Sequence, residues 1–115
     1  IAFNPCEPAY ASVPMDDEGL DTEALEQVLR TTQRVKLIYT VPDFQNPTGR
    51  TMSLARRRRL VELAVEFDVM VLEDTPYREL RYDGERLPSI KSLDTSGRVI
   101  HLGSFSKILA PGLRL

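Results

Sequence analysis

The sequence has 115 residues, of which 42% are hydrophobic, and its 15 basic and 17 acidic residues give a formal net charge of −2. This hydrophobic content supports a packed core and excludes wholesale disorder, while the balanced charge argues against nucleic acid as a partner of this segment. No apolar run approaches the roughly 20 residues that cross a bilayer, so no membrane contact is expected. One histidine and one cysteine support neither a zinc cluster nor an internal disulfide, and they are compatible with the cytoplasmic location that we expect.

The N-terminal part of the chain predicts a strand, a loop and a helix. Residues 10–14 predict a short edge strand, and residues 16–21 predict a loop. Asp21 or Thr22 is suited to cap a helix that runs to about Thr31, because its side-chain oxygen can accept hydrogen bonds from the free N–H groups of the first turn. The apolar residues that share one face of this helix are Ala24, Leu25, Val28 and Leu29.

The middle of the chain predicts a strand, a loop and a second helix. The apolar, β-branched run Val35–Val41 predicts a strand covered on both faces. Prolines break regular structure in residues 42–49, which predict a loop. Ser53 is suited to cap a helix that ends near Phe67, and the run ARRRR at residues 55–59 predicts a solvated surface of that helix. The apolar residues expected to form its buried stripe are Ala55, Leu60, Val61, Ala64, Val65 and Phe67.

The last part of the chain predicts two further strands. Residues 69–73 predict a buried strand that ends at Asp74, and residues 99–103 predict a third strand. The connection between them, residues 75–93, has no regular pattern except for one helical turn expected near its end. This order of elements predicts an α/β fold with a mainly parallel sheet flanked by helices, built with right-handed crossovers.

Polar residues follow each of the three predicted strands. Asn46 lies in the loop after the first strand, Asp74 and Tyr77 follow the second, and residues 104–107 follow the third. Because the carboxyl ends of parallel strands meet at one edge of the sheet, where α/β proteins bind ligands, we predict a site there. Each residue alone has a simpler interpretation: the aspartate as a loop cap, and the tyrosine as a packed ring.

Lys107 directly follows a buried strand and precedes the apolar residues Ile108 and Leu109. Alone it would be interpreted as a surface lysine. In an apolar setting, however, desolvation makes a lysine amine nucleophilic and able to form a Schiff base with an aldehyde. The sequence therefore predicts a desolvated, reactive Lys107.

The neighbours of this lysine suggest what else the ligand carries. Ser104, Ser106 and Arg114 supply hydroxyl and guanidinium donors, which suit a phosphate dianion. Asp74 supplies an anion for a cationic ring nitrogen. Pyridoxal 5′-phosphate carries an aldehyde, a ring nitrogen and a phosphate, so these residues predict this cofactor.

Three motifs then identify a family that the chain resembles. They are NPTG at Asn46–Gly49, DTPY at Asp74–Tyr77, and SFSK followed by APGLR within Ser104–Arg114. With these motifs in this order, the chain resembles the large domain of class I/II aminotransferases, which are fold-type I pyridoxal-phosphate enzymes. The stretch YTVPDFQNPTG resembles the subgroup of 2-aminoadipate and kynurenine aminotransferases. The resemblance covers nearly the whole chain, most firmly Val35–Leu115.

The resemblance implies cofactor-binding roles for Asn46, Asp74, Tyr77, Ser104, Ser106, Lys107 and Arg114. Three of these residues would be catalytic. Lys107 would form a Schiff base with the cofactor and then shuttle the α-proton, Asp74 would pair with the ring nitrogen, and Tyr77 would bond the phenolic oxygen. Asn46 would share that oxygen and bind the substrate carboxylate.

The resemblance also implies an activity and a larger protein. The intact protein would be a homodimeric transaminase that moves an amino group between an amino acid and a 2-oxo acid. Ile1 is not an initiator methionine, and Leu115 ends an apolar stretch, so residues 1–115 are expected to be an internal fragment of the cofactor-binding large domain. The N-terminal segment and the small domain would be absent, and the fragment alone is expected to be inactive.

Two other readings use the same residues. Another fold-type I enzyme, such as a β-lyase or a decarboxylase, would share the cofactor residues and differ in its substrate contacts. A MocR-type transcription regulator would carry the aminotransferase-like domain only to sense an effector.

Overall fold

The three predicted strands form one parallel sheet in the computed structural model, which describes residue 5 and residues 7–113. Strands β3 (Leu37–Thr40), β4 (Met70–Asp74) and β5 (Val99–Leu102) lie in the order β3-β4-β5. Tyr39 is in register with Leu72, and Leu72 with Ile100. The prediction of an α/β fold with a parallel sheet is confirmed, and β4 is the central strand of the three.

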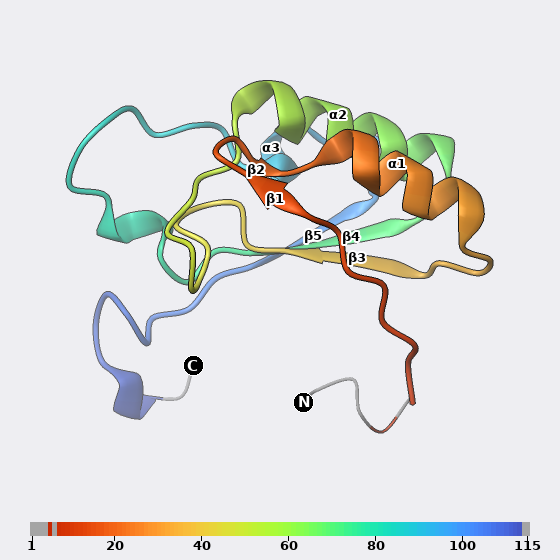
Figure 1. Ribbon diagram of the computed structural model, residues 1–115. Helices are drawn as coiled ribbons and strands as arrows, with labels where there is room; N and C mark the ends of the chain where they lie inside the picture. Colours follow the sequence, from red (N-terminus) through yellow and green to blue (C-terminus); the bar gives the residue numbers. More distant parts are fainter. Residues whose placement is uncertain (1–4, 6, 114–115) are drawn as a thin grey trace.

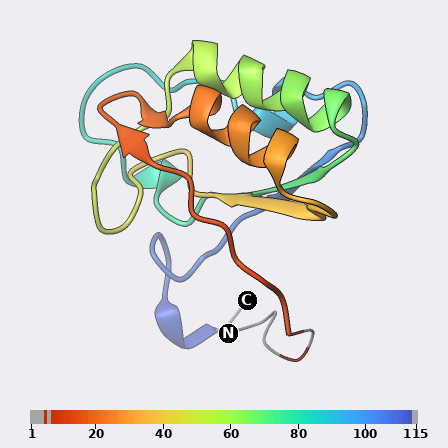
Figure 2. The same ribbon diagram turned by 45° about the vertical axis from the view of Figure 1, so that its right-hand side comes forward.

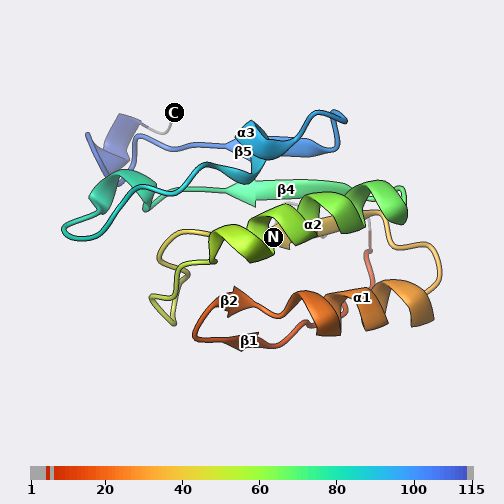
Figure 3. The same cartoon turned by 90° about the horizontal axis from the view of Figure 1, so that it is seen from above.

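The helices cover one face of this sheet (Figure 1). They are α1 (Thr22–Thr31), α2 (Leu54–Glu66) and the single-turn α3 (Ile90–Leu93). Seen from above, α2 lies between α1 and α3, and α3 lies over β5 (Figure 3). The connection after β4 contains one 3₁₀ turn, η2 (Arg78–Leu80), and a second such turn, η3 (Pro111–Leu113), lies near the end of the chain.

Both long helices begin where the sequence predicts. The Asp21 carboxylate accepts hydrogen bonds from the N–H groups of Glu23 and Ala24 at 2.9 and 3.0 Å. The Ser53 hydroxyl accepts one from the N–H of Arg56. These side chains satisfy N–H groups that have no partner within the helix, so each cap defines the first turn.

The core lies between these helices and the sheet. The buried apolar residues are Leu20, Leu25, Leu29, Ile38, Met52, Leu60, Leu63, Ala64, Val69, Val71, Ile90 and Val99. They come from every strand of the sheet and from all three helices, so this single layer of contacts holds the described part of the chain together.

The N-terminal strand was predicted in the wrong place. Residues 10–14 are not a strand; instead β1 (Met15–Asp16) and β2 (Gly19–Leu20) form a small antiparallel hairpin within the predicted loop. Gly19 has φ +90°, and a Cβ at this position would lie 2.8 Å from Cα of Met52. The hairpin therefore depends on a glycine that packs directly against the start of α2.

The first strand of the sheet was predicted to be covered on both faces, and this is wrong. In β3, Ile38 and Thr40 are buried, whereas Tyr39 keeps 53% of its surface exposed. Side chains alternate between the two faces of a strand, and here the helices pack on only one of them. On the opposite side, Figures 1 and 2 show the N- and C-terminal segments running below the sheet.

The buried stripe of α2 also differs from the prediction, because a charged residue belongs to it. Ala55 and Val65 are exposed, while Arg57 and Leu63 are fully buried. Of the run ARRRR, Arg58 is exposed as predicted. The prediction excluded Arg57 from the stripe because arginine is seldom buried without partners.

Arg57 is buried because the surrounding backbone and one carboxylate satisfy its guanidinium. It forms an ion pair with Asp43 at 2.8 Å, and both side chains are 0–1% exposed. It also donates to three carbonyl oxygens, those of Pro42, Met52 and Pro88, at 3.0–3.2 Å. Arg57 thus connects α2 to the segments that follow β3 and precede α3.

A second buried charge connects the central strand to α3. Glu73 is completely buried and accepts hydrogen bonds from the N–H groups of Ile90 and Lys91 at 2.8 and 2.9 Å. These are free N–H groups of the first turn of α3, so the carboxylate caps this turn from the neighbouring strand. No helix among the described residues is long and apolar enough to cross a membrane.

We predict that Arg57→Met destabilises the protein by about 3 kcal/mol, because it leaves the buried Asp43 carboxylate without its closest partner. Urea unfolding measures this change. Arg58→Met is the matched control on the same helix and is expected to stay within about 0.5 kcal/mol of the unmodified protein. Equal unfolding midpoints for the two variants would contradict the structural role of Arg57.

Candidate functional site

The three parallel strands end at the same edge of the sheet, as predicted. The loop after β3, the segment after β4 and the turn after β5 all begin there (Figure 1). The N–H and hydroxyl of Thr75 both donate to the carbonyl oxygen of Leu102, at 2.9 and 3.0 Å. The ends of β4 and β5 are therefore tied together at the point where the candidate residues begin.

The loop that presents Asn46 is closed by its own hydrogen bonds. The N–H of Gln45 donates to the carbonyl of Arg50, and the N–H of Met52 donates to the carbonyl of Pro42. The Thr48 hydroxyl donates to the Gln45 side chain at 2.7 Å. The peptide bond after Asn46 is cis. These local bonds define the conformation of the loop around the candidate amide.

Asn46 and Tyr77 come together from the segments that follow β3 and β4. The Asn46 side-chain N–H points to the Tyr77 hydroxyl at 3.4 Å, which is near the upper limit for a hydrogen bond. The two groups are 31 positions apart in the sequence. The predicted meeting of residues from the first and second strand ends is therefore observed.

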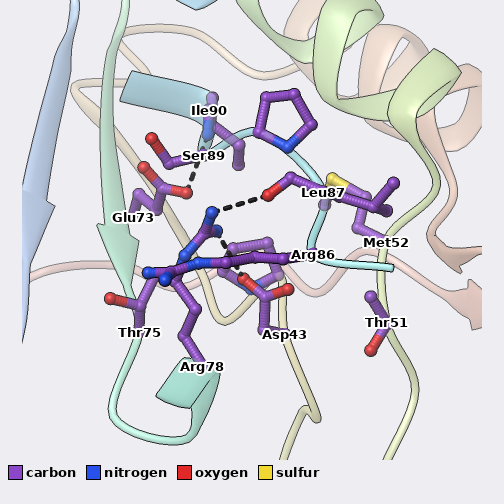
Figure 4. Close-up of polar contacts among 12 residues, drawn as sticks. Asp43, Thr51, Met52, Glu73, Thr75, Arg78, Arg86, Leu87, Ser89 and Ile90 are labelled. Atoms are coloured by element: carbon purple, nitrogen blue, oxygen red, sulfur yellow. Dashed lines mark hydrogen bonds and ion pairs between the residues drawn. The ribbon is translucent and has the colours of Figure 1, made fainter. Parts of the chain in front are cut away.

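A partly buried arginine connects these two segments. Arg78, the residue after Tyr77, donates to Asp43 at 3.1 Å and to the carbonyl oxygen of Leu87 at 2.6 Å (Figure 4). Asp43 lies three residues before Asn46, so the ion pair joins the two segments that carry the candidate amide and phenol. A third arginine, Arg81, lies 3.6 Å from the same carboxylate and stacks over the ring of Phe44.

Asp74 ends the central strand and projects from the face that carries no helix. Val71 and Glu73 point into the core, so alternation places Asp74 on the opposite face, together with Tyr39. The Tyr39 hydroxyl donates to the Asp74 carboxylate at 2.8 Å. Partial burial of the phenol is the larger cause, and this hydrogen bond the next, of a rise in the pKa of Tyr39 to about 12.

Ser104, Ser106 and Lys107 share the turn after β5. The N–H of Ser106 donates to the Ser104 hydroxyl at 3.1 Å, and the N–H groups of Ile108 and Leu109 donate to the carbonyl of Phe105. Lys107 is exposed, so the prediction of a desolvated amine is wrong for this part of the protein. The apolar residues that follow it provide no cover, because Leu109 is 72% exposed and projects with the turn away from the core.

The site thus has two groups of residues. In the first, Asn46 meets Tyr77, and Asp74 lies three residues before Tyr77 in the sequence. In the second, Ser104, Ser106 and Lys107 share the turn after β5. Among the described residues, no hydrogen bond or ion pair joins Lys107 to any residue of the first group. The predicted phosphate ligand Arg114 lies outside the described residues.

A hollow lies beside Asn46 and Tyr77, and its wall is mainly apolar. Its lining residues are Phe44, Gln45, Asn46, Pro47, Gly49, Tyr77, Leu80, Tyr82 and Asp83. Neither Asp74 nor Lys107 lines it. The hollow therefore borders two of the candidate residues and not the other two, and it has room for a bulky apolar group next to the Asn46 amide.

The sequence analysis missed two contributors to this site. Tyr39 was assigned to a strand buried on both faces, and Asp43 was assigned to the loop without a role. For Tyr39 the available signal is the alternation of strand side chains, which places it on the face opposite to Ile38 and Thr40. Its partner, however, depends on the register with β4. For Asp43 no local signal exists, because its partners lie 14 and 35 positions away.

The donors and acceptors at this edge fit pyridoxal 5′-phosphate. Asp74 offers a carboxylate to a cationic ring nitrogen, and its geometry is already supported by Tyr39. Asn46 and Tyr77 offer an amide N–H and a phenol to a ring oxygen. Two hydroxyls, those of Ser104 and Ser106, suit a phosphate, and the exposed Lys107 is the amine in the same turn.

Comparisons with a family model and with known proteins both find aminotransferases. The family described as "Aspartate amino-transferase" matches residues 9–113. An aromatic-amino-acid aminotransferase of Thermococcus litoralis is 51% identical over 99% of this chain. The chain covers 28% of that relative's length.

Solved structures show the same similarity. A kynurenine aminotransferase of Pyrococcus horikoshii, crystallised in complex with PMP, superposes with a TM-score of 0.94 at 56% identity, over 98% of this chain and 29% of its own. The α-aminoadipate aminotransferase LysN of Thermus thermophilus, complexed with N-(5′-phosphopyridoxyl)-L-leucine, gives a TM-score of 0.87 at 44% identity, over 98% and 30% of the two chains.

We predict that Tyr39 ionises about two pH units above a free tyrosine, because partial burial of the phenol and its hydrogen bond to the Asp74 carboxylate both favour the neutral form. Absorbance near 295 nm during an alkaline titration measures this ionisation, and Tyr39→Phe should remove one high-pH component. Because the pKa of Tyr39 is higher in the folded protein, its neutral phenol contributes to the free energy of unfolding. This contribution should be complete below pH 10 and lost as the pH rises towards about 12. A Tyr39 component that titrates near pH 10 would contradict the partial burial of the phenol together with its hydrogen bond to Asp74.

Proposed function

The chain belongs to the aspartate aminotransferase family, and on this basis we propose that it is part of a pyridoxal-phosphate-dependent aminotransferase. The intact protein would transfer an amino group between an amino acid and a 2-oxo acid. The 115 residues would form an internal part of its cofactor-binding large domain, because the chain spans 28–29% of the relatives that it resembles. The observation that carries the proposal is the position of Asp74, Asn46 and Tyr77 at one sheet edge.

Two of the similar solved structures support pyridoxal 5′-phosphate as the cofactor. The Pyrococcus structure contains PMP, and the Thermus structure contains a phosphopyridoxyl group joined to leucine. When bound, pyridoxal 5′-phosphate supplies a ring that withdraws electrons from the α-carbon of an amino acid. The protein must do the rest. Its side chains must orient the ring, keep the ring nitrogen protonated and move one proton.

In the proposal, each residue of this chain has one of those tasks. The Asp74 carboxylate binds the ring N–H and keeps that nitrogen protonated. The Asn46 amide and the Tyr77 hydroxyl orient the ring through its phenolic oxygen. The Lys107 amine would condense with the cofactor aldehyde with loss of water; once the substrate amine has displaced it, the free amine would accept and return the α-proton, which is general acid–base catalysis. Ser104, Ser106 and Arg114 hold the phosphate.

The substrate is proposed to be an amino acid with a bulky side chain. The relatives reported above are named for aromatic amino acids, kynurenine and α-aminoadipate. The apolar hollow beside Asn46 is consistent with a large substituent near the amide that would bind the substrate carboxylate. All three of these relatives are aminotransferases, which favours a transferase over an effector-sensing regulator. A homodimer and a cytoplasmic location are further parts of the proposal and rest on the family resemblance.

We predict that borohydride reduction of the intact protein with pyridoxal 5′-phosphate labels Lys107 and no other lysine of these 115 residues. The chain contains three lysines, and the other two, Lys36 and Lys91, are also exposed, so exposure by itself would label all three. Peptide mapping by mass spectrometry after proteolysis gives the site. Equal labelling of the three, or no adduct on Lys107 in the folded protein, would exclude the proposed role of this lysine.

We also predict that the intact protein transaminates aromatic amino acids or 2-aminoadipate, measured as 2-oxo acid formed over a panel of amino donors. Lys107→Ala should lower the rate by about 10²–10⁴-fold, the usual contribution of a general acid–base. Lys36→Ala is the control and should keep full activity, because Lys36 lies just before β3, at the end of that strand opposite to the site. A panel with no active donor would refute the transferase, and the 115-residue segment alone should give no turnover above free cofactor.

A further inference from the structure

The contact between Tyr39 and Asp74 is not explained by the packing of the core. Tyr39 lies on the sheet face that carries no helix and is 53% exposed, and Asp74 is partly exposed on the same face. In the register of β3 and β4, Tyr39 pairs with Leu72. Asp74 is therefore the diagonal neighbour two residues further along, a distance that an aromatic side chain can span.

We propose that Tyr39 is a positioning residue for the carboxylate that binds the cofactor ring. Its hydroxyl donates to Oδ2 of Asp74 at 2.8 Å, which fixes the rotation of the carboxylate and leaves Oδ1 for the ring nitrogen. The inference rests on the proposed function, because it assigns Tyr39 a task only where Asp74 binds a cofactor.

The geometry supports a role for Tyr39 in orienting the Asp74 carboxylate and not in binding the cofactor itself. Tyr39 is anchored in β3, and the hydrogen-bonded backbone of β3 and β4 sets the distance between the two side chains. A carboxylate at the end of a strand otherwise rotates freely about its side-chain bonds, and restricting such a rotation before a ligand arrives improves binding. Among the described residues, the Tyr39 hydroxyl is the only side-chain donor to Asp74.

Two ionisable groups among the described residues act on the Tyr39 phenol, Asp74 and Tyr77. Of these, Asp74 accepts its hydrogen bond. The hydroxyl is therefore committed to the carboxylate and presents it to a cationic ring nitrogen in one orientation.

A double-mutant cycle on the intact protein tests whether Tyr39 acts through Asp74. The four proteins are the unmodified form, Tyr39→Phe, Asp74→Ala and the double variant. The dissociation constant of pyridoxal 5′-phosphate is measured with the cofactor-free proteins, together with the absorption maximum of the bound cofactor. We expect Tyr39→Phe to weaken binding about tenfold and to shift the absorption band when Asp74 is present. In the Asp74→Ala background, the same change should alter affinity less than about twofold and leave the band in place.

Tyr10→Phe is the control, because Tyr10 is 72% exposed and its side chain makes no hydrogen bond among the described residues; it should match the unmodified protein. Thermal unfolding confirms that each variant is folded, and Asp74→Asn replaces Asp74→Ala if the alanine variant is not. Unchanged affinity in Tyr39→Phe, or an equal loss in both backgrounds, would overturn the inference while leaving the proposed function intact. Failure of the unmodified protein to bind the cofactor would overturn both.

Discussion

The ion pair between Arg57 and Asp43 is the constraint on which the rest of this structure depends. A guanidinium without contact to water is costly unless nearly all its donors are satisfied. Arg57 meets this requirement with one carboxylate and three backbone carbonyls, from both sides of the loop after β3 and from the segment before α3. Chain segments that are distant in sequence must therefore lie at fixed positions around one helix.

The same carboxylate connects the fold to the site. Asp43 accepts from Arg78 as well as from Arg57, so the segment that carries Tyr77 is tied to the loop that carries Asn46. The meeting of an amide and a phenol at the sheet edge is thus a consequence of buried electrostatics and does not require their own weak contact at 3.4 Å. Buried polar networks of this kind are costly when incomplete, which makes the arrangement specific.

The two faces of the sheet have different tasks. One is filled by the helices and holds the core, while the other carries Asp74 and its partner Tyr39 on an open surface. The turn after β5 is different again, because among the described residues its hydrogen bonds are local and Lys107 is exposed. The half of the site that follows β3 and β4 is therefore held by the core, and the half that carries the lysine is held by its own turn.

Much of this was determined by the sequence alone. The apolar runs and the caps at Asp21 and Ser53 predicted the sheet and both long helices, because these signals act within a few residues. The tertiary structure alone decided that Arg57 is buried, that the sheet is covered on one face, and that Tyr39 reaches Asp74. Each of these depends on strand register or on partners far along the chain, and neither composition nor periodicity contains that information.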